Sequence, residues 1–270
     1  MKGKAILLIS GLALIASCKE NNQLKDKKSN WLPDVNNENH GAVQQKEVVG
    51  DFDEIEVSQS INAEIIKSDV EKIVISAPSN IINEILVEQS GGKVHIHYKS
   101  GVRVINAMNV SAKIYAKDFT KLKATSSASI NIKDKFVQDK TDIEVSSSGS
   151  IKGNLEANNM DISADSSGSF EGEIWAINLE TEADSAGSIT IKGKSKNAAL
   201  DTSSGGSISA KQLMAENVKA DASSGANVEI SASHSVEAEA SSGGSISVFK
   251  TGNLSVVKKE ESSGGSVTIQ

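Results

Sequence analysis

The acidic residues that precede two of the chain's Ser-rich turns have a spacing that could support chemistry. Asp165 stands directly before Ser166-Ser167-Gly168, and Asp184 stands directly before Ser185-Ala186-Gly187, 19 residues later. If these segments stack as successive coils of a β-structure, their backbones lie about 4.8 Å apart. Retaining glycosidases use two carboxyl groups at about this separation, and carboxylates are also ligands that calcium prefers. Asp165 and Asp184 are therefore the candidates for a catalytic pair or a metal site.

The rest of the sequence favours a non-enzymatic interpretation of these acids. Acidic residues also stand near the later turns: Asp201, Asp221, Glu239 and Glu260. Lyase-type chemistry on a β-scaffold needs a nearby arginine or metal cluster, and the chain has a single arginine, Arg103. The Gly-Gly-x-Gly-x-Asp repeat of calcium β-rolls is absent from the sequence. We therefore predict no catalytic residue and no cofactor, and we interpret the acids as an exposed charged edge that limits aggregation.

Two histidines form the other arrangement that could bind a metal. His95 and His97 alternate with apolar residues over residues 93–98, so both lie on the polar face of a predicted strand. Histidines at this spacing can ligate zinc. The sequence shows no third ligand, however, and two exposed strand residues are the commoner case. The sequence alone therefore predicts no metal site at these histidines.

Cys18, the only cysteine, indicates where the protein is located. It follows a segment with Lys2 and Lys4, an apolar run over residues 5–15 and two small residues, which is the pattern of a secretory signal. The run is too short for a membrane span, which needs about 20 apolar residues. The pattern resembles a bacterial lipoprotein signal, in which the cysteine is acylated and the chain is cut just before it. An ordinary cleaved signal with a nearby cysteine is the alternative.

The lipoprotein resemblance predicts a lipid-anchored protein of the Gram-negative cell envelope. Residues 1–17 would be the signal peptide, and Cys18 would join the chain to the outer membrane. Lys19-Glu20 resembles a short signal that sends some lipoproteins to the outer face of that membrane. Residues 18–46 are polar and aperiodic, which is typical of a flexible tether. The formal net charge of −7 argues against nucleic acid as a partner.

The remaining chain divides into two β-rich regions. Residues 47–124 contain short alternating stretches and form an N-terminal β region, a cap or a set of early coils. Gly91-Gly92 separates two of these stretches, 85–89 and 94–98, and predicts a hairpin. Residues 125–270 repeat a Ser-Ser-Gly-Ser-Ile turn or a close variant, and each turn ends on an apolar residue: 130, 151, 170, 189, 208, 228, 246 and 267.

The spacing of these turns predicts the architecture of the second region. A period of 18 to 21 residues is too short for a helical-pair repeat or a propeller blade, and it fits one coil of a β-solenoid with about 19–20 residues per repeat. Inward Ile and Val would form stacked columns, and Gly would supply backbone angles that other residues avoid. A sandwich of hairpins is the alternative architecture.

The chain from about Val49 to Gln270 resembles the family called putative auto-transporter adhesin, head GIN domain. The residues that carry the resemblance are Phe52-Asp53-Glu54-Ile55, Ile61-Asn62 and the Ser-Ser-Gly-Ser-Ile turns, with Ser60 where the family has glycine. The resemblance implies a right-handed parallel β-helix similar in shape to pectin-lyase-type proteins but without their catalytic residues. It also implies cell-surface placement and adhesion.

Three functions follow as hypotheses. The first is a non-enzymatic, lipid-anchored binding module that presents a repetitive face to a surface, glycan or protein ligand. The second is a structural module that self-associates end to end, since the sequence ends at Ile269-Gln270 directly after a predicted strand and solenoid ends need covering. The third is a pectin-lyase-like carbohydrate-active enzyme that uses the stacked carboxylates of Asp165 and Asp184.

Overall fold

The computed structural model describes residues 34–35, 41–104 and 109–270, so Cys18 and the predicted signal peptide lie outside the described residues. These residues form strands and one short 3-10 turn, η1 (Ile82–Glu84), which confirms the all-β prediction. The early strands are β1 (Asp34–Val35), β2 (Val43–Val49), β3 (Glu54–Val57), β4 (Asn62–Lys67), β5 (Lys72–Pro78), β6 (Ile85–Ser90), β7 (Lys93–Tyr98), β8 (Arg103–Val104) and β9 (Ser111–Ala116). The later strands are β10 (Lys121–Ala124), β11 (Ser129–Ile132), β12 (Phe136–Val145), β13 (Ser150–Lys152), β14 (Leu155–Ala164), β15 (Ser169–Ala183), β16 (Ser188–Thr202), β17 (Ser207–Ala222), β18 (Asn227–Ala240), β19 (Ser245–Lys250), β20 (Val256–Glu261) and β21 (Ser266–Ile269).

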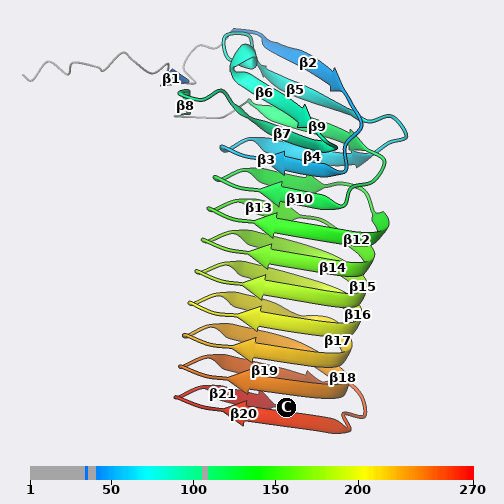
Figure 1. The fold of residues 1–270 in the computed structure, drawn as a ribbon, viewed down its shortest axis with the longest axis vertical. Coiled ribbons are helices and arrows are strands. Elements are labelled where there is room, and N and C mark those ends of the chain that lie inside the picture. Colours follow the sequence, from blue (N-terminus) through cyan, green and yellow to red (C-terminus); the bar gives the residue numbers. More distant parts are fainter. Residues whose placement is uncertain (1–33, 36–40, 105–108) are drawn as a thin grey trace, which may run out of the picture. The chain divides into compact units, whose positions relative to one another are not determined.

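The second region is a β-solenoid, as predicted. Its strands pair in parallel with the strand one coil later, so that Phe170 of β15 lies opposite Ile189 of β16. The solenoid has about eight such coils of about 19 residues each. They stack from β10, which begins at Lys121 and so precedes the predicted start at residue 125, to β21 (Figure 1). A sandwich of hairpins would require antiparallel pairs here. The parallel pairing therefore excludes that alternative for the described strands of this region.

The interior of the solenoid consists of stacked apolar columns. The residue that follows each Ser-rich turn points inward and is at most 2% exposed: Ile130, Ile151, Phe170, Ile189, Ile208, Val228, Ile246 and Val267. Alternation along each strand then sends every second side chain outward. The long strand β15 shows this in its burial pattern, in which buried and exposed residues alternate over most of its length. The outward residues of successive coils therefore form continuous rows on the surface.

The Ser-rich turns correct the role predicted for glycine. In the turn Ser166-Ser167-Gly168, the two serines have positive φ values of 50° and 62°, and Gly168 does not. A Cβ at Gly168 would lie 2.3 Å from the carbonyl oxygen of Val145 on the preceding coil. This glycine is therefore required for space rather than for backbone angle. Later turns have two glycines with different roles. Gly205 adopts the positive backbone angle, with φ of 74°, and Gly206 leaves space for the preceding coil.

This division of roles predicts that Ala186→Gly stabilises the protein. Ala186 has φ of 63°, a left-handed backbone conformation that is strained for a residue with a Cβ atom. It is also exposed, so its methyl group does not contribute to the core. An L-residue in the left-handed conformation is destabilised by about 1–2 kcal/mol. Replacing it by glycine removes this cost, and the larger entropy of glycine in the unfolded chain offsets part of the gain. We expect the free energy of unfolding to rise by about 1 kcal/mol, measured by urea denaturation. An unchanged or lower value would contradict the assignment of strain to this position.

The N-terminal β region joins the solenoid through parallel pairs. β3 pairs with β10, and β4 pairs with β11, so these two strands form a coil like those that follow. β2 and β5 are antiparallel, as are β5 and β9, and β6 and β7 form the predicted hairpin. β2 begins at Val43, inside the range predicted as tether. Within the described ranges, no helix reaches the length and hydrophobicity that crossing a bilayer requires.

Candidate functional site

The carboxylates of Asp165 and Asp184 belong to the turns that they precede. The two residues occupy equivalent positions on adjacent coils, as predicted. Asp165 Oδ1 accepts a hydrogen bond from the backbone N–H of Ser166, at 2.6 Å. Asp184 Oδ1 accepts one from the N–H of Ser185 at 2.6 Å and one from the hydroxyl of Ser203 at 2.8 Å. Each carboxylate therefore already has a structural role as a cap of its own turn.

These hydrogen bonds do not fit the chemistry of a glycosidase acid. The bond from Ser203, followed by those from the backbone of Ser185 and the side chain of Ser204, lowers the pKa of Asp184. A general acid needs a raised pKa, so that it holds a proton at neutral pH. Asp184 therefore does not suit the role of a general acid.

The later acids form a separate row. Asp201, Asp221, Glu239 and Glu260 are in register with Glu182, two residues before the Asp184 position. At the position equivalent to Asp184, the next coil has a serine instead of an acidic residue. The positions of the acids near the turns did not indicate this difference. Lysines neutralise part of this row, since Lys219 and Lys258 form ion pairs at 3.4 Å and 3.2 Å with their acidic neighbours. The row is consistent with the predicted charged edge.

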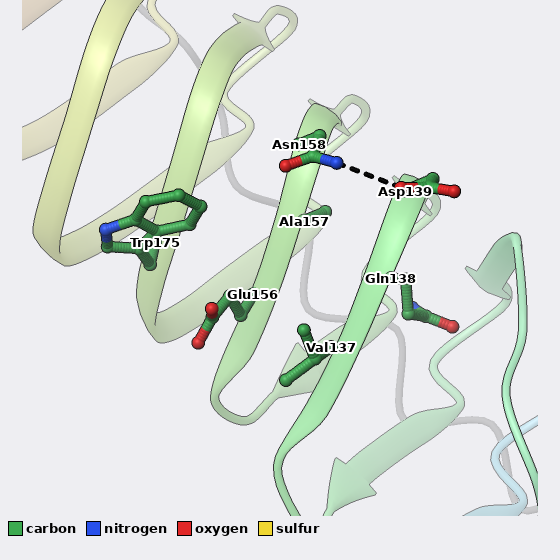
Figure 2. A pocket seen from close by; sticks show the side chains of 7 residues that line it. All are labelled: Val137, Gln138, Asp139, Glu156, Ala157, Asn158 and Trp175. Atoms are coloured by element: carbon green, nitrogen blue, oxygen red, sulfur yellow. Dashed lines mark hydrogen bonds between the residues drawn. The ribbon is translucent and has the colours of Figure 1, made fainter.

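An exposed tryptophan provides a different candidate for ligand binding. Trp175 points outward from β15 and is 42% exposed, in the same outward row as Glu156 and Val137. Beside it is a hollow of about 240 Å³ that spans three coils, which we call the Trp175 hollow. Figure 2 shows its polar rim, where Asn158 donates a hydrogen bond of 2.9 Å to Asp139. Its lining residues are Val137, Gln138, Asp139, Glu156, Ala157, Asn158 and Trp175.

A second depression follows the stacked asparagines of the later coils. Asn159, Asn178, Asn197 and Asn217 are joined by side-chain hydrogen bonds of 2.9 to 3.0 Å. Beside this ladder lies a groove of about 470 Å³, which we call the Ala199 groove. Ala199 has charged residues at the equivalent positions of the adjacent coils, and its small side chain leaves this space. The groove therefore has an uncharged floor between charged walls.

The histidines of β7 acquire a third neighbour that the sequence analysis missed. His95 and His97 lie on the same face, as predicted, and Glu88 of β6 is opposite His95. The two-residue turn at Gly91-Gly92 fixes this register, so the contact could have been derived from the predicted hairpin. Burial lowers the pKa of His95, and the nearby carboxylates of Glu56 and Glu88 oppose this effect.

Comparison with known proteins agrees with the architecture. A family model described as putative auto-transporter adhesin, head GIN domain, matches residues 51–252. A crystal structure of a putative adhesin from Parabacteroides merdae is 18% identical, with a TM-score of 0.79 over 85% of this chain and 97% of that chain. A putative adhesin from Parabacteroides distasonis is 20% identical, with a TM-score of 0.75 over 82% and 97%.

A third solved structure carries a different description. It is a putative lipid-binding protein from Parabacteroides distasonis, 21% identical, with a TM-score of 0.69 over 85% of this chain and 97% of that chain. Among curated proteins, none matches the chain. At these identities the solved structures establish a shared fold.

Proposed function

The chain belongs to the family of putative auto-transporter adhesins with a head GIN domain, and on this premise we propose that it is a lipid-anchored cell-envelope protein that binds a surface ligand through the outer face of its solenoid. The family carries no enzymatic description. Adhesin relatives of the same fold support a location at the cell surface. The signal-like segment that ends at Cys18 supports the lipid anchor.

The exposure of Trp175 is the observation that carries the binding proposal. Single exposed apolar residues are ordinary on protein surfaces, whereas neighbouring exposed apolar residues are typical of interaction sites. Trp175 has Val137 in its own outward row and Ile177 two residues along its strand, and both are more than a third exposed. Tryptophan is enriched among residues that dominate binding energy, and its indole offers both an apolar face and an N–H donor. Together with the amide and carboxylate groups of the hollow, it suits a glycan or a polar protein segment.

We expect Trp175→Ala to weaken ligand binding without unfolding the protein. The test measures retention of the purified protein on a panel of immobilised glycans and proteins. We expect at least a tenfold loss of affinity, since truncating a central aromatic typically costs 2 kcal/mol or more, about a thirtyfold effect. Val70→Ala is the matched control, because Val70 is 61% exposed and lies outside the hollow. Equal binding by both variants would exclude the Trp175 hollow as the ligand site.

The lipid anchor has an independent test. Cys18→Ser removes the only thiol that an acyl chain could modify, so the protein should move from the membrane fraction to the soluble fraction of the cell. Protease treatment of intact cells then shows whether the anchored protein faces the exterior. Protection from the protease would restrict it to a periplasmic role and would contradict adhesion.

A structural role is the second candidate, and the last coil favours it. Among the described strands, β20 and β21 pair only with the coil before them, through β18 and β19. Val256 and Val257 of this coil are about half exposed. An unpaired parallel edge beside exposed apolar residues can add a further strand. Light scattering distinguishes this function, because a monomer at high concentration would count against end-to-end assembly.

A further inference from the structure

The hairpin of β6 and β7 lies near the N-terminal end of the coils (Figure 1). It brings together three side chains of types that bind metals, Glu88, His95 and His97. One ligand atom each from Glu88, His95 and His97 lies within 4.8 Å of the other two. The two imidazole rings stack, with centroids 4.2 Å apart. Ligand atoms bound to a tetrahedral zinc ion are about 3.4 Å apart. Side-chain adjustments of about 1 Å would therefore close the three groups around one ion.

The environment of His97 is that of a metal ligand. Its Nδ1 lies 2.7 Å from the backbone oxygen of Tyr98. A carbonyl oxygen only accepts, so Nδ1 carries a proton, and in the neutral ring Nε2 carries the free lone pair. This Nε2 is buried and makes no hydrogen bond, yet it lies 3.3 Å from Glu88 Oε2. A ring N–H that donates to a backbone carbonyl is the usual support of a histidine ligand.

The second histidine is also held in place. His95 Nε2 lies 3.0 Å from the hydroxyl of Ser58, a residue that is itself buried. On the neighbouring strand β3, Glu56 is in register with His95 and forms an ion pair with Lys93 at 2.6 Å. These contacts fix the ring from the side of the solenoid, while Glu88 approaches from the free edge of the hairpin.

We propose that Glu88, His95 and His97 form a binding site for a divalent transition-metal ion of the zinc class. Two imidazole nitrogens with one carboxylate oxygen suit zinc and its neighbours, whereas calcium and magnesium prefer oxygen ligands alone. Three protein ligands leave a fourth position open to water or to a group of a bound partner. The site is separate from the Trp175 hollow, which lies on β12, β14 and β15. If the metal-site proposal failed its test, the proposed binding function would therefore be unaffected.

The simpler interpretation is an ion pair between Glu88 and a protonated His97. Both interpretations account for a distance of 3.3 Å between Nε2 and Oε2. They differ in the role of His95, which the ion pair does not need and the metal site does. They also differ in whether an added ion is bound in a fixed ratio.

The test is titration of the purified full chain, without a histidine tag, with Zn²⁺ by calorimetry and with Co²⁺ by visible absorption. We expect one ion per chain, and absorption bands typical of nitrogen- and oxygen-coordinated Co²⁺. His95→Ala and His97→Ala should each weaken Zn²⁺ binding at least tenfold. Glu88→Gln should also weaken it, and this residue is exposed, so its replacement does not threaten the fold.

His234→Ala is the matched control, because His234 is an exposed histidine on β18, outside the cluster. It should bind Zn²⁺ as the unaltered protein does. Thermal unfolding gives a second measurement, since Zn²⁺ should raise the Tm of the unaltered protein and of His234→Ala but not that of His97→Ala. Absence of 1:1 binding in the unaltered protein would overturn the proposal, and so would binding that survives both His95→Ala and His97→Ala. Either result would leave the ion pair as the explanation.

Discussion

Replacing Phe170 by alanine is expected to lower the free energy of unfolding by about 3–5 kcal/mol, the range for large aromatic residues in protein cores. Phe170 is 1% exposed and occupies the inward column between Ile151 and Ile189. Its ring also fills space beside Gly172, since a Cβ added there would lie 3.1 Å from Phe170 Cζ.

The cavity left by this substitution cannot be filled from its neighbours. In the next coil, two isoleucines occupy the positions that Phe170 and Gly172 occupy here. The single side chain of Phe170 therefore fills the space that two isoleucine side chains fill in the next coil. Gly172 cannot be enlarged to compensate, because a Cβ there would lie 2.2 Å from the carbonyl oxygen of Gly153. Since each coil is stabilised by its contacts with adjacent coils, the loss weakens the stack on both sides.

Chemical denaturation measures this effect as a lower midpoint with an unchanged slope. Val137→Ala is the control, because it removes methyl groups from a side chain that is 61% exposed. Such surface changes stay within about 0.5 kcal/mol. A loss below about 1 kcal/mol for Phe170→Ala would show that the column repacks, contrary to the expectation for a regular solenoid.

The solenoid could be predicted because its signal is local and repeated. Each coil carries its own turn and its own alternation, so the spacing between Ile189 and Ile208 already gives the length of a coil. The N-terminal β region lacks such a period. Its sheet pairs β2 with β5 and β5 with β9, contacts that depend on chain packing and not on a repeated motif. The sequence therefore predicted the strands of this region and the hairpin of β6 and β7, but not how the other strands pair.

The binding surfaces were less predictable, for a related reason. A hollow depends on which outward residues adjoin across coils, and one small residue such as Ala199 opens a groove only because its neighbours are large. The alternation of β15 predicts that Trp175 points outward, but its neighbours Glu156 and Val137 follow only from the register of the coils. Glu88 is the exception, because a two-residue hairpin turn fixes which residue faces His95.

Replacing Gly187 by valine is the second substitution from which we expect a large effect. Gly187 is buried at a turn, and a Cβ there would lie 2.0 Å from the carbonyl oxygen of Ala164 on the preceding coil. That oxygen already accepts a hydrogen bond from the N–H of Asp184, at 3.0 Å. The coils must therefore separate locally to admit the side chain, and this breaks the ladder at the turn. Overpacking of this kind costs about 3 kcal/mol.

The equivalent position in other turns shows which side chains fit at Gly187. Ala128 and Ala226 occupy the equivalent position and make the same turn hydrogen bond, so a methyl group is accommodated in some coils. A branched side chain needs more room than a methyl group, and the cost should rise from Gly187→Ala to Gly187→Val. Gly205→Ser is the control, because a Cβ at Gly205 meets nothing within 4 Å and only its φ of 74° opposes the change. That control should cost about 1–2 kcal/mol. If it destabilises the protein more than Gly187→Val does, the turns are limited by backbone angle and not by the space between coils.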